Sequence, residues 1–111
     1  MSNEEDRCLT HPGKAFERRI AKLFPEGRRR GADFRGDDGG KTDVISPGWA
    51  IECKLLGRPS FGQLLSAAKQ AEDNASSSHD CPVAIVKRKN DKDGNALVVM
   101  RLKTWLEWYV S

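Results

Sequence analysis

Two acidic residues and a lysine stand close together in the stretch KTDVISPGWAIECK, residues 41–54. Pro47-Gly48 is a turn signal between two short apolar runs, which predicts a β-hairpin. With the turn centred on that dipeptide, the register places Asp43 directly opposite Glu52. Directly opposed residues have Cβ atoms about 5 Å apart, and like charges there repel each other, so the pair needs a proton or a cation.

Alternation along the second strand puts Glu52 and Lys54 on one face and Cys53 on the other, so Cys53 is interpreted as a small core residue. Two carboxylates at this distance suit magnesium, which completes its shell with water or phosphate. A neighbouring ammonium can orient a water and stabilise charge on phosphorus oxygens. The trio therefore indicates phosphodiester hydrolysis. The simpler alternative is an ordinary strand whose polar residues face solvent.

An amphipathic helix is predicted over Gly13 to Phe24 and ends before Pro25. Its apolar stripe comprises Phe16, Ile20, Leu23 and Phe24. On a helical wheel Glu17 lies at the edge of this stripe, whereas Arg18 and Lys22 point away from it. The helix therefore presents one acid toward the core side and bases toward solvent.

The remaining elements follow from periodicity and turn signals. They are a short strand at Arg28 to Arg30, a loop over 31–41, a helix over Ser60 to Ala75, a loop over Asn74 to Asp80, strands at Pro82 to Val86 and Ala96 to Leu102, and a short C-terminal helix. Ser60-x-x-Gln63 and Thr104-x-x-Glu107 are capping-box patterns that predict two helix starts.

Three aromatic residues crowd the C-terminal helix, namely Trp105, Trp108 and Tyr109. Their spacing places them on one helical face, so they are expected to complete the core or a dimer interface.

The length of 111 residues fits one domain, here 13–111, after a polar tail at 1–12. Three widely spaced cysteines indicate neither a disulfide framework nor a zinc site. No apolar run is long enough to span a bilayer, and the acidic start differs from a signal peptide, so a cytoplasmic location and no membrane partner are expected.

The charge is unevenly distributed along the chain. The net charge is +3, yet the segment from Arg7 to Gly36 contains nine Arg or Lys against three acids. This clustering favours a polyanionic partner, and the alternative is a solvated basic face.

These residues together resemble the PD-(D/E)xK nuclease superfamily, in particular the small archaeal-type Holliday junction resolvases also found in phages. The matching pieces are GKAFERRIAKLF, GGKTDVI and AIECK. The resemblance implies an α/β restriction-endonuclease-like core, a mixed central β-sheet flanked by helices. Thr42 stands where the family motif has proline, and the loop RGADFRGDDGGK lacks the serine that the resolvases carry there.

The resemblance also implies a magnesium- or manganese-dependent endonuclease that works as a homodimer and resolves branched DNA by paired nicks. Asp43, Glu52 and the Cys53 backbone carbonyl would bind the metal, Lys54 would serve the attacking water, and Glu17 would lie in the outer metal shell. The candidate DNA-binding residues are Lys14, Arg18, Arg28, Arg29, Arg30, Arg35 and Gln70.

Other functions stay open. One is a related nuclease of single-stranded, flap or duplex DNA. A non-catalytic nucleic-acid-binding module would keep the basic surface without turnover, and a protein-interaction domain would use the C-terminal aromatics. Gln70 is equally well explained as a solvent-facing glutamine.

Overall fold

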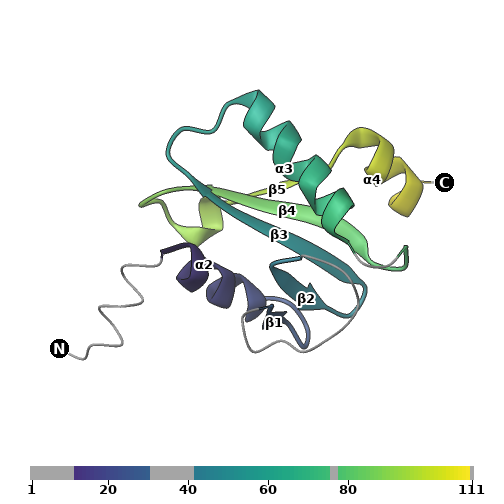
Figure 1. Ribbon diagram of the computed structural model, residues 1–111, viewed down its shortest axis with the longest axis horizontal. Helices are drawn as coiled ribbons and strands as arrows, with labels where there is room; N and C mark the ends of the chain where they lie inside the picture. Colours follow the sequence, from purple (N-terminus) through teal and green to yellow (C-terminus); the bar gives the residue numbers. More distant parts are fainter. Residues whose placement is uncertain (1–11, 31–41, 76–77, 111) are drawn as a thin grey trace.

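The computed structural model describes residues 12–30, 42–75 and 78–110, and the expectations for 1–11, for the loop at 31–41 and for Arg35 lie outside the described residues. The described chain forms a mixed β-sheet with α2 on one face and α3 on the other, while α4 lies beside α3 (Figure 1). The expected α/β class with flanking helices is confirmed.

The elements follow the predicted order. They are α2 (Pro12–Ala21), β1 (Arg28–Arg29), β2 (Val44–Ser46), β3 (Trp49–Leu56), α3 (Phe61–Asn74), β4 (Cys81–Arg88), the 3₁₀ helix η1 (Asp93–Asn95), β5 (Leu97–Val99) and α4 (Leu102–Tyr109). The five strands lie in sequence order across the sheet. Only the β3–β4 pairing within it is parallel, because α3 crosses over between these strands.

The hairpin of β2 and β3 has the predicted register. Val44 pairs with Ile51 and Ile45 with Ala50. Gly48 has a φ of 82°, a left-handed conformation that suits the glycine after proline in a type II turn. The turn therefore fixes which residues oppose each other further along the strands.

Helix α2 ends at Ala21, three residues before the predicted end at Phe24. The amides of Leu23 and Phe24 donate to the carbonyl groups three residues back, which tightens the chain into turns before Pro25. As a result Leu23 is 71% exposed, and its assignment to the buried stripe is wrong. Phe24 stays half-buried and packs edge-on against Trp49.

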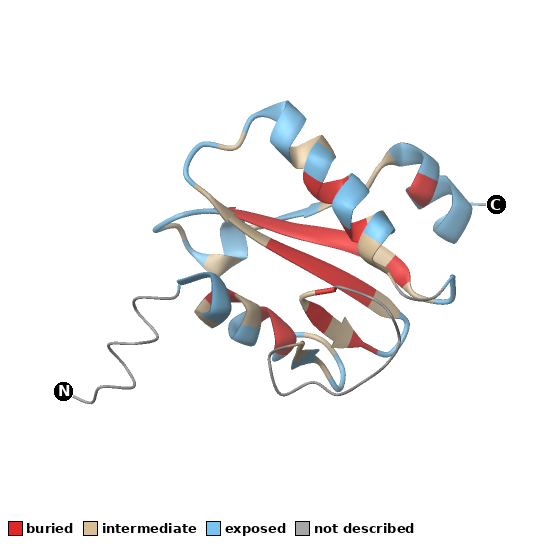
Figure 2. Ribbon diagram, viewed as in Figure 1, coloured by how far each residue is buried: buried red, intermediate tan, exposed pale blue. Residues whose placement is uncertain are grey.

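The core has two parts, one on each face of the sheet, with β3 and β4 as the most buried strands (Figure 2). The part between α2 and the sheet is formed by the buried residues Phe16, Ile20, Ala21, Val44, Ile51, Cys53, Val83 and Ile85. The part between α3 and the sheet is formed by Ala67, Ala71, Ala84 and Val86. Small alanine side chains let α3 pack close to the sheet. As a result the end of α3 reaches Glu52, a polar residue of β3.

The capping box of α3 is confirmed, because the Ser60 hydroxyl accepts from the Gln63 amide and the Gln63 side chain accepts from the Ser60 amide. The second box is wrong. Arg101 is the N-cap of α4, and Thr104 lies inside the helix, where its hydroxyl donates to Glu72 at 2.7 Å. Arg101 also donates to Glu72, so this carboxylate holds α4 against α3.

The aromatic side chains of α4 do not complete the core. Trp105, Trp108 and Tyr109 are 48%, 36% and 47% exposed. Of the two roles expected for them, burial in the core is wrong, and a dimer interface stays a prediction.

Helix α2 is attached to the far end of the sheet by charged side chains. Arg19 donates to Asp93 at 2.7 Å, and the buried Lys87 of β4 donates to the same carboxylate at 2.9 Å. The hydrogen bond from Arg19 contributes most to lowering the pKa of Asp93 to about 2. These contacts fix α2 over the sheet and thereby fix the position of Glu17.

Candidate active site

Asp43 and Glu52 meet at the start of β2, as the hairpin register predicts. Asp43 directly precedes β2, and its Oδ2 accepts a hydrogen bond of 2.9 Å from the Cys53 amide on the neighbouring strand. The Asp43 carbonyl accepts from the Arg30 amide at 2.8 Å. The carboxylate is therefore held against β3 beside Glu52.

Glu52 is buried, with 3% of its surface exposed. Burial, the charge of Asp43 and a hydrogen bond between the two carboxyl groups raise the pKa of Glu52 to about 7. An ordinary strand with its acid facing solvent would leave this carboxyl exposed, so that alternative is wrong for Glu52. The two acids therefore titrate as a pair, because ionising both of them at once is unfavourable.

Two other side chains approach the Glu52 carboxylate. Asn74, the last residue of α3, donates from Nδ2 to Oε1 at 3.2 Å. The Lys54 ammonium lies 3.5 Å from Oε2, and the Lys54 side chain is 30% exposed. The Asn74 amide and the Lys54 ammonium thus contact different oxygens of Glu52. Lys54 faces both Glu52 and the solvent.

Cys53 packs in the core beneath α2, as predicted. Burial and the neighbouring carboxylates, Asp43 first among them, raise the pKa of its thiol. The thiol therefore stays protonated and is no thiolate ligand. Only the Cys53 backbone enters the candidate site.

Glu17 approaches the pair from the other side of the sheet. Its Oε1 accepts a hydrogen bond of 2.8 Å from Nε of Arg29 on β1, and its side chain is 18% exposed. Burial and the charge of Asp43 raise the pKa of Glu17, whereas the hydrogen bond from Arg29 opposes this rise. Arg29 is thus bound to Glu17. The structure brings Asp43, Glu52 and Lys54 together, and Glu17 is near enough to Asp43 to feel its charge.

The other candidate DNA-binding residues spread over several elements. Lys14 and Arg18 are exposed on α2, and Lys14 is near enough to Glu17 to act on its pKa. Arg28 is exposed on β1, and Arg30 follows that strand. Gln70 is exposed on α3, one helical turn before Asn74.

The donor set fits magnesium or manganese. Within 12–30, 42–75 and 78–110, no three His, Cys, Asp or Glu side chains form a group that could hold a metal ion. Mg²⁺, however, is commonly bound by one or two protein carboxylates, with water and substrate phosphate as its other ligands. Asp43 and Glu52 meet this requirement, because one is half-buried, the other is buried, and a cation would neutralise the charge that they share.

Sequence reasoning missed two residues of the site, Asn74 and Thr42. Asn74 falls where the predicted helix over Ser60 to Ala75 overlaps the predicted loop over Asn74 to Asp80, and in the structure it continues the inward row of Ala67 and Ala71 at helical spacing. A polar residue at the end of an apolar row was the available signal. Thr42 was noted only as a replacement for proline, yet it is 6% exposed and its hydroxyl is hydrogen-bonded.

Comparison of the chain with protein-family models, curated proteins and solved structures gives no match. Among the helices of the described segments, none is sufficiently long and apolar to cross a membrane. Function must therefore be argued from the site itself.

Proposed function

We propose that the chain is a metal-dependent endonuclease of branched DNA with a restriction-endonuclease-like core. The observation that carries the proposal is the carboxyl pair of the half-buried Asp43 and the buried Glu52, with the Lys54 ammonium 3.5 Å from Glu52. A protein gains nothing in stability from burying Glu52 beside a second acid, so the pair is best explained by a cation that neutralises it.

Each side chain has a distinct task in this reaction. Asp43 and Glu52 hold Mg²⁺ or Mn²⁺, which supplies Lewis-acid chemistry when bound. Lys54 orients the attacking water and stabilises charge on the phosphate oxygens. Arg29 keeps the outer acid Glu17 in place beside the pair.

The substrate is expected to be recognised by its backbone and shape. The basic candidates on α2 and β1 can contact phosphates, which position a protein but carry no sequence information. Branched DNA, with Holliday junctions as the first candidate, follows from the resemblance of the motifs.

The decisive test is cleavage of a labelled four-way junction beside duplex, flap and single-strand controls, with magnesium and with EDTA. Magnesium-dependent paired nicking of the junction alone supports the proposal. Cutting of the other substrates would make the protein a general nuclease. Salt-dependent binding without any cutting would indicate a binding module and overturn the catalytic proposal.

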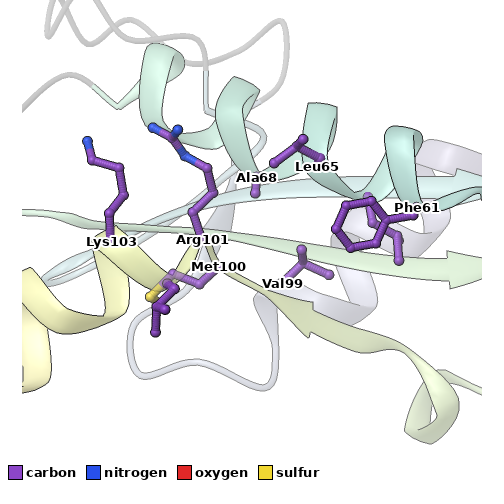
Figure 3. A pocket seen from close by; sticks show the side chains of 9 residues that line it. Phe61, Leu65, Ala68, Val99, Met100, Arg101 and Lys103 are labelled. Atoms are coloured by element: carbon purple, nitrogen blue, oxygen red, sulfur yellow. The ribbon is translucent and has the colours of Figure 1, made fainter.

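A homodimer is the proposed working form, and the surface around β5 and α4 is suited to it. An apolar pocket of about 450 Å³ lies between α3 and the segment from β5 into α4 (Figure 3). Its lining is Phe61, Leu64, Leu65, Ala68, Val99, Met100, Arg101, Leu102 and Lys103. Leu97, Val98, Leu102 and the α4 aromatics are also exposed. An apolar pocket with exposed apolar residues on the elements around it is typical of protein interfaces.

Replacing Trp108 by alanine is expected to shift the protein from dimer toward monomer. Trp108 is the least exposed of the α4 aromatics, and large aromatic side chains contribute most to interfaces. Sedimentation equilibrium measures the shift, with Leu23→Ala as a control that removes another exposed apolar side chain. A dimer that survives Trp108→Ala unchanged would rule out this interface.

A further inference from the structure

Thr42 and Asn74 connect the two acids of the site through hydrogen bonds that do not belong to the sheet. The Thr42 hydroxyl donates to the Asn74 carbonyl at 3.2 Å. Asn74 in turn donates its side-chain amide to Glu52 at 3.2 Å. Thr42 directly precedes Asp43, so a continuous path runs from one acid to the other through the end of α3.

Both groups of the Thr42–Asn74 contact have a physical reason to pair. Asn74 is the last residue of α3, and the final carbonyl groups of a helix have no partner within it. Thr42 is 6% exposed, so its hydroxyl needs a partner inside the protein. Proline, the residue of the family pattern at this position, has no hydroxyl and could not make this bond.

We propose that Thr42 and Asn74 form a brace that fixes the separation and orientation of the Asp43 and Glu52 carboxylates for the metal. The brace rests on the proposed function, since it positions the two ligands of that site. Thr42 and Asn74 are positioning residues, because they act through the acids and contact no substrate.

The site needs such a brace because the hairpin alone does not restrain both acids. Asp43 lies outside the paired residues of β2 and is held by the Cys53 amide. The Glu52 carboxyl group lies beside Asp43 and is held on one oxygen by Asn74. The hydroxyl of Thr42 fixes the end of α3, and therefore also the position from which Asn74 donates its hydrogen bond to Glu52.

The test uses the full chain and four variants: Thr42→Val, Asn74→Ala, the double variant, and Thr42→Ser as the conservative control. Calorimetric titration with Mn²⁺, without DNA, measures the affinity of the site. We expect about tenfold weaker binding for Thr42→Val and Asn74→Ala, the size typical of groups that orient metal ligands. The double variant should bind about as weakly as the weaker single variant, and Thr42→Ser should match the wild type.

Amide hydrogen exchange without metal gives a second, independent measurement. The Cys53 amide should exchange several-fold faster in Thr42→Val, because its acceptor Asp43 is less well held. The amide of Ile85, in the centre of β4, should not change and serves as the internal control.

The outcomes separate the brace from the function. Wild-type Mn²⁺ affinity in Thr42→Val and Asn74→Ala would overturn the brace while leaving the nuclease proposal intact. A wild-type protein that binds no Mn²⁺ would refute the metal site. In that case the exchange rate of the Cys53 amide tests the brace by itself, and an unchanged rate in Thr42→Val would overturn the brace as well.

Discussion

Replacing Glu52 by glutamine is expected to lower the rate of DNA cleavage about a thousandfold or more. The amide keeps the shape of the side chain but removes the charge that holds the cation. A bound metal lowers the barrier of such reactions by several kcal/mol, and each 1.4 kcal/mol changes the rate about tenfold. Single-turnover cleavage of a labelled junction measures the loss. DNA affinity in calcium should stay within about twofold, because the phosphate contacts lie on other residues.

Two comparisons sharpen this result. Asp43→Asn should cause a loss of the same size, since the two acids form one pair. Glu107→Gln makes the same chemical change at an exposed position of α4 and should leave the rate unchanged. Cleavage at the wild-type rate by Glu52→Gln or Asp43→Asn would refute the mechanism.

The metal-free protein is expected to lose stability as the pH rises from about 4.5 to about 7. The pKa of Glu52 is raised from 4.5 to about 7 by burial and by Asp43, so the folded protein keeps a proton that the unfolded chain releases. The folded state then binds more protons, and the free energy of unfolding falls with pH through this range and levels off above it. The expected loss is at most about 3 kcal/mol.

Urea unfolding in EDTA at several pH values measures this dependence. The pKa of Glu17 is also raised, chiefly by burial, and adds a loss in the same direction. The pKa of Asp93 is lowered to about 2, so its ionisation changes stability only at lower pH and does not affect the profile in this range. Glu52→Gln should flatten the profile, and magnesium at pH 8 should restore the stability of the wild type. Parallel profiles for wild type and Glu52→Gln would contradict the coupled pair.

The part of the fold that sequence could predict is the part that depends on local signals. The Pro47-Gly48 turn and the alternation of β3 specify the hairpin, so the meeting of Asp43 with Glu52 follows from some ten residues. The Ser60 capping box is equally local. The order of elements follows because each has its own periodicity.

The errors arose where tertiary contacts decide. Thr104 matches a capping box, but its hydroxyl is taken by Glu72 of another helix, and the helix starts earlier. Leu23 continues the helical stripe, but the chain turns before it. Asn74 joins the site only because α3 packs closely across β3, which no short window of sequence reveals.

The parallel pairing of β3 with β4 also has a consequence for the order in which the site assembles during synthesis. The hairpin bearing both acids closes through a two-residue turn, so it can form as soon as it leaves the ribosome. Asn74 and β4 come later in the chain and depend on the long-range crossover through α3. The nascent chain therefore brings its two carboxylates together before the amide that orients one of them has left the ribosome.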